Sequence, residues 1–295
     1  NQGDFSHGLA RLKNWRDDLV GAIGAYQEWV ERQNTADGER DLRVYELIEA
    51  LRLDKITIAL AAESSRGKSE LLNAMFFTDS KQRLLPSGSG RTTMCPTELR
   101  YDEKEPPCIK LLPIETRTTT LTISEYKRTP IQWTTIHLLK PNYHAEVREA
   151  FLEVTRTKKV HVRAAQELGL YNPTQTRRAG DPVPQNETIE IPVWRHAVIN
   201  FPHPLLKQGL IILDTPGLNA LGVESELTLS MLPGAAALLF VLGTDTGVTQ
   251  SDLDVWNQCT QSATRRHHLV VLNKVDMLWD ELKDEDTIAD TIARQ

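Results

Sequence analysis

Cysteine is scarce in this 295-residue chain, and its three cysteines are odd in number and far apart. Cys95, Cys108 and Cys259 offer neither the paired spacing of a disulfide framework nor the clustered spacing of a metal site. The sequence also lacks the charged and apolar pattern of a secretory signal peptide. We therefore expect a reduced protein that is cytoplasmic.

A long apolar run is missing as well. The longest one extends from Gly234 to Gly243, about half of the ~20 residues that a membrane-spanning helix needs. A run of this length is typical of a buried central strand. Any membrane contact is then expected to be peripheral, or to be made by a region outside this sequence.

An excess of positive charge is absent too. The formal net charge is −6, with acidic and basic residues interspersed, which argues against nucleic acid as a partner. The basic pairs Lys158-Lys159 and Arg177-Arg178 are short and typical of solvated surface. With 40% hydrophobic residues the chain can bury one large core or two modest ones.

What the chain does contain is a strand that leads into a Gly-Lys-Ser loop. The β-branched run Lys55 to Leu60 precedes Ala62-Glu-Ser-Ser-Arg-Gly-Lys-Ser69, and a helical segment follows. This pattern predicts a phosphate-binding loop. Backbone N–H groups and the helix N-terminus attract phosphate, Lys68 adds a positive charge, and the Ser69 hydroxyl is placed to ligate Mg²⁺.

The first glycine of the usual loop pattern is replaced by Ala62. Glycine is favoured where the backbone approaches a phosphate or takes an unusual φ, and alanine is the smallest residue that carries a Cβ. We expect phosphate binding to survive this change. The alternative is a chance Gly-Lys-Ser at the start of a solvated helix.

A second motif follows another apolar strand, Leu210 to Leu213, which ends in Asp214-Thr-Pro-Gly217. In phosphate-loop proteins an Asp at the end of the neighbouring strand helps to hold Mg²⁺, and the glycine N–H reaches the γ-phosphate. A Pro-Gly turn after a strand is common by itself. The motif indicates a Mg²⁺ and γ-phosphate site because it follows a phosphate loop in the sequence.

A third motif, Asn273-Lys-Val-Asp276, follows the apolar run His268 to Leu272. The Asp276 carboxylate can accept hydrogen bonds from the guanine N1–H and 2-amino groups, which adenine does not offer. Asn273 is expected to brace the loop, and Lys274 to lie along the base. The three ordered motifs predict a guanine-nucleotide site, with GTP as substrate, GDP as product and Mg²⁺ as cofactor.

A fourth element is expected in the Gly/Ser-rich stretch from Leu85 to Thr97, where a threonine would fold over the γ-phosphate and Mg²⁺. Thr92, Thr93 and Thr97 are the candidates. The residues themselves leave the choice open.

On these motifs the chain resembles the dynamin superfamily, in particular bacterial dynamin-like proteins and, around the switch, mitofusins. The resemblance covers about residues 54–100 and 205–280 and implies a P-loop α/β fold of the Ras-like, dynamin type, with a mainly parallel sheet. It selects Thr93 as the switch threonine. The matching segments are Ser64-Ser65-Arg66-Gly67-Lys68-Ser69, Leu71-Leu72-Asn73-Ala74, Leu85-Pro86-Ser87-Gly88, Thr92-Thr93 and the motifs at Asp214 and Asn273.

The resemblance also implies roles for individual residues. The expected catalytic residues are Ser64, Ser65, Arg66, Lys68 and Thr93. The expected nucleotide-binding residues are Glu63, Ser64, Ser65, Arg66, Gly67, Lys68, Ser69, Gly217, Asn273, Lys274 and Asp276. The expected metal ligands are Ser69, Thr93 and Asp214. Either the Thr93 backbone or Ser64 and Ser65 position the attacking water. Arg66 either stabilises transition-state charge or is a solvated or phosphate-neutralising side chain.

A dynamin-like protein is expected to hydrolyse GTP in a manner coupled to self-assembly and membrane remodelling. The implied partner is a second copy that docks through the GTPase domain, or a paired dynamin-like protein. The alternative is a GTP-binding switch or scaffold with little intrinsic hydrolysis, which Ala62 and Ser64 motivate.

Two domains are expected. Apolar residues recur every three or four positions from Leu9 to Val30, which predicts a long helix, and a second helix is expected over 41–51. Residues 1–53 therefore form either a neck segment of the dynamin type or a helix lying on its own domain. Residues 54–295 form the GTPase domain, with an insertion at about 102–208.

Within and beyond the insertion, the patterns predict further elements. Strands are expected at 109–112, 118–124, 131–139 and 188–193, helices at 145–157, 160–168 and 279–293, and a loop at 172–186. A Ras-type core needs one more strand and a final helix after these. We therefore expect the GTPase domain to be incomplete at the C-terminal end of this sequence.

Overall fold

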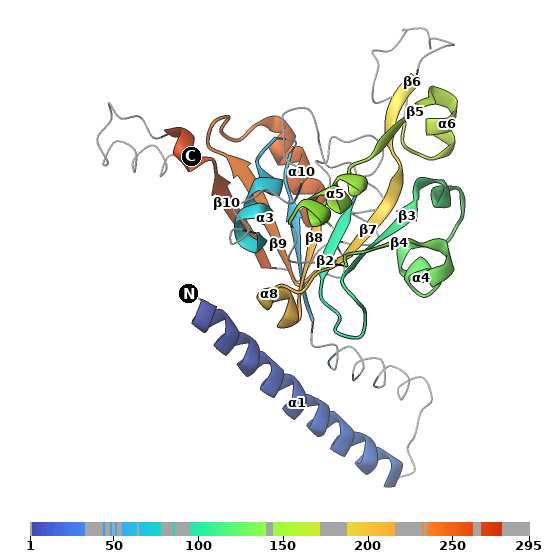
Figure 1. Ribbon diagram of the computed structural model, residues 1–295. Helices are drawn as coiled ribbons and strands as arrows, with labels where there is room; N and C mark the ends of the chain where they lie inside the picture. Colours follow the sequence, from blue (N-terminus) through green and yellow to red (C-terminus); the bar gives the residue numbers. More distant parts are fainter. Residues whose placement is uncertain are drawn as a thin grey trace. The chain divides into compact units, whose positions relative to one another are not determined.

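In the computed structural model the chain forms two compact units, residues 1–56 and 57–295 (Figure 1). The structure describes residues 2–32, 44, 48, 51, 55–63, 65–77, 85, 95–139, 144–171, 188–215, 232, 235–261 and 267–278.

The first unit contains the predicted long helix, α1 (Gln2–Arg32). Tyr26 and Trp29 stack on it, with ring centroids 6.2 Å apart, because residues three positions apart are neighbours on a helix surface. Among the helices of the described residues, none is long and apolar enough to cross a membrane. The predicted second helix at 41–51 lies mostly outside the described residues, as does the predicted helix at 279–293.

In its described part, the second unit is built on an eight-stranded sheet with the strand order β10-β9-β1-β8-β2-β7-β3-β4. The strands are β1 (Ile56–Ala61), β2 (Thr97–Arg100), β3 (Cys108–Pro113), β4 (Thr134–His137), β7 (Trp194–Asn200), β8 (Leu210–Asp214), β9 (Ala237–Gly243) and β10 (His267–Asn273). β9 is the apolar run that the sequence predicted as a central strand. It pairs with β1 on one side and β10 on the other.

The sheet is mixed. β9 runs parallel to both β1 and β10, and β2 runs parallel to β7. β2 is antiparallel to β8, and β3 is antiparallel to both β7 and β4. The predicted α/β class with a mainly parallel sheet is confirmed, and the antiparallel pairings involve the strands that flank and enter the insertion.

Helices cover both faces of the sheet (Figure 1). They are α3 (Lys68–Phe76), α5 (His144–Val154), α8 (Pro204–Lys207) and α10 (Gln250–Gln261). Successive strand residues point to opposite faces, so Leu60 packs with Leu72 and Phe151 in one core, whereas Ala59 packs with Val255 in the other. β1 is therefore covered by α3 and α5 on one face and by α10 on the other.

The insertion departs from the sequence-based predictions in several places. The strand predicted at 118–124 is wrong: η2 (Ile114–Thr118) and α4 (Ile123–Lys127) stand there, because Thr122 and Glu125 form a reciprocal capping box that starts a helix. The helix predicted from residue 160 begins later, as α6 (Val162–Glu167). Residues up to His161 instead belong to a strand.

That strand, β5 (Thr157–His161), pairs antiparallel with β6 (Thr188–Pro192) in a separate two-stranded sheet. The strand predicted at 109–112 is β3, and the one predicted at 131–139 contains β4, which η3 (Pro130–Gln132) precedes. The helix predicted at 145–157 corresponds to α5, and the strand predicted at 188–193 to β6. β7 was not predicted. The loop predicted at 172–186 lies outside the described residues.

Candidate nucleotide site

The phosphate loop connects β1 to α3, as the sequence predicts. Its first position, Ala62, is fully buried, and Ala62 is not among the described residues with positive φ. The left-handed positions are Ser65, with φ 65°, and Gly67, with φ 84°. An alanine fits the first position because the unusual backbone conformations fall later in the loop.

The loop lysine faces the second motif. Lys68 Nζ lies 3.2 Å from Asp214 Oδ1, and both side chains are buried. Burial raises the pKa of Asp214, and the ammonium group of Lys68 partly offsets that rise. Among the described residues, the Lys68 Nζ and Asp214 Oδ1 atoms are buried without an aligned hydrogen bond.

These two atoms fit the ligands that the sequence predicts. An ammonium group with free donors suits a phosphate, and a carboxylate oxygen suits a hard cation such as Mg²⁺. Ser69 follows Lys68 directly in the loop, and it lines a cavity with Asp214 and Thr97 whose other walls are mostly apolar core residues. The donor set at this end of β1 and β8 is therefore the one expected around a Mg²⁺-bound triphosphate.

The third motif, Asn273-Lys-Val-Asp276 (the predicted guanine motif), meets the phosphate loop directly. Asn273, the last residue of β10, donates its amide Nδ2 to the backbone oxygen of Arg66 at 3.0 Å. The two segments are so close that a Cβ on Gly67 would lie 2.3 Å from Asn273 Nδ2. The bracing contact expected of Asn273 is thus present. Asp276 lies exposed in η6 (Val275–Leu278), directly beyond this contact.

Lys274 is held from the loop that follows β9. Its ammonium group donates to Asp245 Oδ2 at 2.7 Å, and the Thr244 hydroxyl donates to the Lys274 carbonyl at 2.7 Å. The hydrogen bond from Lys274 lowers the pKa of Asp245, although burial opposes the change. The backbone of Lys274 is left-handed, with φ 59°.

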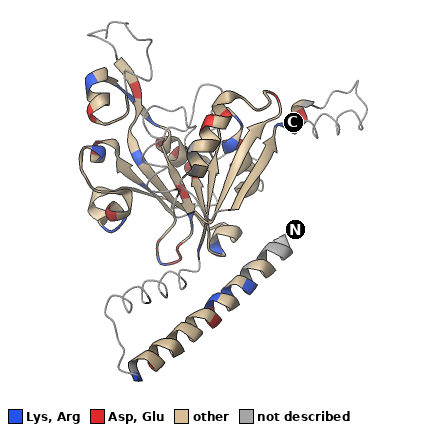
Figure 2. Cartoon of the chain, turned by 180° about the vertical axis from the view of Figure 1, so that it is seen from behind, with Lys and Arg blue, Asp and Glu red and all other residues tan. Residues whose placement is uncertain are grey.

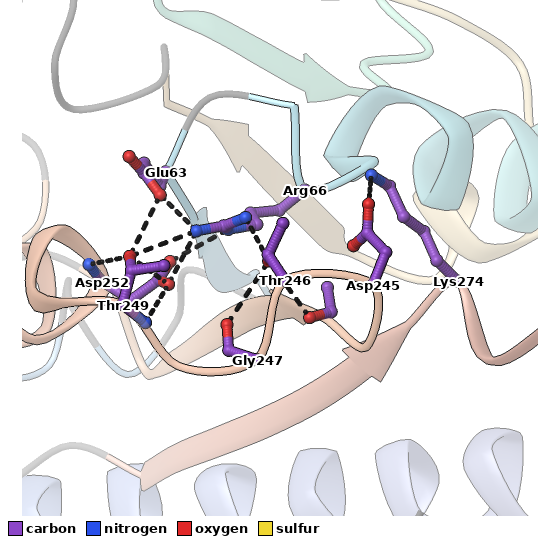
Figure 3. Close-up of polar contacts among 9 residues, drawn as sticks. Glu63, Arg66, Asp245, Thr246, Gly247, Thr249, Asp252 and Lys274 are labelled. Carbon is purple, nitrogen blue, oxygen red and sulfur yellow. Dashed lines mark hydrogen bonds and ion pairs between the residues drawn. The ribbon is translucent and has the colours of Figure 1, made fainter. Parts of the chain in front are cut away.

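Arg66 is not the solvated side chain that the sequence suggested as one alternative. It is only 5% exposed. Its guanidinium group donates to Asp252, from Nε to Oδ1 at 3.1 Å and from Nη2 to Oδ2 at 2.8 Å, and it also bonds Glu63, Thr246 and Thr249 (Figure 3). Figure 2 shows that, in the described part of the chain, basic and acidic positions are distributed over many elements.

Sequence reasoning missed Asp245, Thr246, Thr249 and Asp252. The sequence contains one signal for two of these residues, because Thr249-x-x-Asp252 has the spacing of a helix N-cap. The Thr249 N–H donates to Asp252 Oδ2 at 2.9 Å, and the Asp252 N–H donates to Thr249 Oγ1 at 3.2 Å. The pattern predicts the start of α10, but it does not reveal a partner in the phosphate loop.

Several predicted site residues lie outside the described residues, namely Ser64, Thr92, Thr93 and Gly217. Ser65 is exposed in the loop. Thr97 is a buried residue of β2 whose hydroxyl donates to the Cys95 carbonyl at 3.1 Å. The choice of Thr93 as the switch threonine stays a prediction.

The fold and the meeting of the three motifs define a P-loop nucleotide-binding domain. A family model described as "Dynamin family" matches residues 58–275. The chain therefore belongs to the dynamin family, which confirms the resemblance inferred from its motifs.

Solved structures of an oligomerised bacterial dynamin pair, described as sensing and tethering membranes over long range, are similar to this chain. One is 19% identical with a TM-score of 0.48, and the match covers 97% of this chain and 35% of that one. A second has the same identity and TM-score, with coverages of 96% and 34%. The chain thus spans about a third of the length of these structures. No curated protein matches it.

Proposed function

We propose that this protein binds GTP together with Mg²⁺ and hydrolyses it to GDP and phosphate. The observation that carries the proposal is the pair of contacts that joins the three motifs. Lys68 lies against Asp214, and Asn273 bonds the backbone of Arg66. Motifs distant in the sequence thereby meet at the carboxyl ends of β1, β8 and β10, where α/β sheets bind their ligands.

The chemistry of each side chain suits a different part of the bound nucleotide. Lys68 and the backbone N–H groups of the loop hold the β- and γ-phosphates, and Asp276 selects guanine through its two acceptor oxygens. Ser69, Thr93 and Asp214 would hold Mg²⁺, which neutralises phosphate charge when bound. Ser64, Ser65 or the Thr93 backbone positions the attacking water.

The buried Lys68–Asp214 pair prepares the site before nucleotide arrives. Each charge compensates the other in a region where an isolated ion would be costly. The contact with Asp214 therefore holds the Lys68 side chain at the end of β8. Within the described part of the chain, Lys68 Nζ and Asp214 Oδ1 are buried without a hydrogen-bond partner, so the ammonium group can donate to a phosphate oxygen and the carboxylate oxygen can bind a cation.

We further propose a cellular role on the basis of dynamin family membership. Hydrolysis would be coupled to self-assembly through the GTPase domain, or to pairing with another dynamin-like protein. The protein would act in the cytoplasm and remodel membranes through peripheral contact.

Phosphate release in a single turnover tests the enzymatic proposal. We expect purified wild-type protein to release phosphate from GTP faster than the solution background, with a rate that rises with protein concentration if assembly contributes. The Lys68→Ala variant should fall to background. A background rate for the wild type at every concentration would overturn hydrolysis and favour a GTP-binding switch or scaffold. Equal competition by ATP would overturn the guanine assignment.

A further inference from the structure

Arg66 makes the most extensive buried polar network of the phosphate loop in the described residues. Its guanidinium group forms a two-point ion pair with Asp252 of α10, which lies 186 positions away in the sequence. Glu63 supplies a second carboxylate, and Thr246 and Thr249 supply hydroxyl groups (Figure 3). The guanidinium group is thus surrounded by acceptors from the phosphate loop, from the loop between β9 and α10, and from the start of α10.

The geometry of the ion pair constrains the arginine. A planar guanidinium that meets both oxygens of one carboxylate is fixed in orientation as well as in distance. Asp252 is itself buried and held by the Thr249 N–H and hydroxyl groups. Burial tends to raise the pKa of Asp252, but the hydrogen bonds from Arg66 and Thr249 outweigh it and hold the pKa below its usual value.

The backbone of Arg66 is held from the opposite direction. Its carbonyl oxygen accepts the hydrogen bond from Asn273 of the guanine motif, and it directly precedes Gly67 and Lys68. The loop between β9 and α10 also contacts the guanine motif, through the Asp245–Lys274 ion pair. Arg66 is therefore the point at which the phosphate loop is tied both to α10 and to the guanine-binding loop.

We propose that Arg66 is a positioning residue, anchored by Asp252, that holds the phosphate loop in the conformation that receives the nucleotide phosphates. Asp252 then controls nucleotide affinity through Arg66. This assignment differs from an arginine that stabilises transition-state charge, because the guanidinium donors are engaged by Asp252, Glu63, Thr246 and Thr249. The proposal rests on the proposed nucleotide-binding function, but the conformation of the loop can be measured without ligand.

The experiment compares wild type with Arg66→Met, Asp252→Asn and the double variant. Methionine keeps much of the length of the side chain, and asparagine keeps an oxygen that can accept the Thr249 cap. Hydrogen–deuterium exchange on the nucleotide-free protein reports the loop at 62–69. Fluorescence titration with a labelled GDP reports affinity, and steady-state kinetics separate KM from kcat.

We expect faster exchange at 62–69 in each single variant, together with an affinity about tenfold weaker. The double variant should be no worse than either single one, because each change breaks the same contact. Arg66→Lys should recover part of the affinity, since it restores the charge without the planar fork. KM should rise more than kcat falls.

The matched control is Lys110→Met, which breaks the ion pair between Lys110 of β3 and Glu105; β3 lies four strands away from β1. It should leave the exchange at 62–69 and the affinity unchanged. Unchanged exchange in Asp252→Asn, or a fall in kcat of Arg66→Met at constant affinity and exchange, would overturn the proposal. If the wild type binds no guanine nucleotide, the proposed function falls, while the exchange measurement still decides the role of Arg66.

Discussion

The Lys68 ammonium group lies 3.2 Å from the Asp214 carboxylate, and neither group is accessible to solvent to any large extent. The contact joins the phosphate loop to the end of β8. Its consequence is that each charge depends on the other for its place in the interior, so loss of one partner affects both stability and nucleotide binding.

Replacing Lys68 by methionine should destabilise the protein as well as weaken GTP binding. The Asp214 carboxylate would be left buried without its counter-charge, and its pKa, already raised by burial, should rise further. We expect the free energy of unfolding at neutral pH to fall by about 3–5 kcal/mol, measured by urea denaturation without nucleotide. The double variant Lys68→Met/Asp214→Asn should regain part of that loss. Wild-type stability in the single variant would contradict the buried pair.

Gly67→Ala should separate the phosphate loop from the guanine motif. The new Cβ would lie 2.3 Å from Asn273 Nδ2, and the φ of 84° is unfavourable for any residue with a side chain. We expect a stability loss of about 1–3 kcal/mol and clearly weaker binding of labelled GDP. The matched control is Gly21→Ala in α1, where a Cβ meets nothing within 4 Å and should stabilise the helix by about 0.5–1 kcal/mol. Equal behaviour of the two variants would refute the close approach.

Asp276→Asn should change base specificity. Guanine loses an acceptor for its N1–H and 2-amino groups, so its affinity should fall by about tenfold to a hundredfold. Xanthine carries a carbonyl in place of the 2-amino group, and the asparagine amide can donate to it. Competition of GTP and XTP for a labelled nucleotide measures the change. A variant that keeps the wild-type preference for GTP would remove Asp276 from the base-binding role.

His196 should make stability depend on pH. It is fully buried in β7, and burial lowers its pKa to about 3, helped by the positive charges of Lys127 and Arg195 and opposed by Glu98. In the unfolded chain the imidazole has its ordinary pKa of 6.5. Between these values the unfolded state binds more protons, so stability falls as pH decreases below about 6.5.

The expected slope from His196 is at most ~1.4 kcal/mol per pH unit, measured by urea denaturation between about pH 6.5 and 4.5. Glu98, whose pKa lies below its usual value of 4.5 because its cationic neighbours outweigh burial, adds a further loss only under more acidic conditions. His196→Phe should flatten the curve in the upper window. The same replacement at the exposed His137 is the control and should leave the curve unchanged. An unaltered slope in His196→Phe would contradict the prediction.

Some features could be predicted from the sequence because they depend on neighbours along the chain. The runs that became β1, β8 and β9 are mostly apolar because helices cover the sheet on both faces. The helix α1 follows from apolar residues at helical spacing. The strand predicted at 118–124 was wrong because a local apolar pattern does not outweigh a helix cap. The capping pair of Thr122 and Glu125 starts a helix there.

β7 was missed for a related reason. It contains Arg195 and His196, which are polar, yet every residue of the strand is buried. Arg195 is buried because its guanidinium donates to the Thr116 and Leu121 carbonyls and its charge lies 5.5 Å from the Tyr126 ring centroid. Those partners are far from β7 in the sequence, so the residues next to the strand do not indicate that it is buried within the sheet.

The three nucleotide motifs, and with them family membership, are determined by the sequence alone, since each consists of a few contiguous residues after an apolar strand. What Arg66 does was decided only by the tertiary structure. The residue types around it are compatible with a solvated, a phosphate-binding or a catalytic arginine. The sheet order places α10 beside the phosphate loop, and a carboxylate 186 positions away then accepts from both Nε and Nη2 of the guanidinium. Burial makes that contact strong, because an unpaired charge in the same place would be costly.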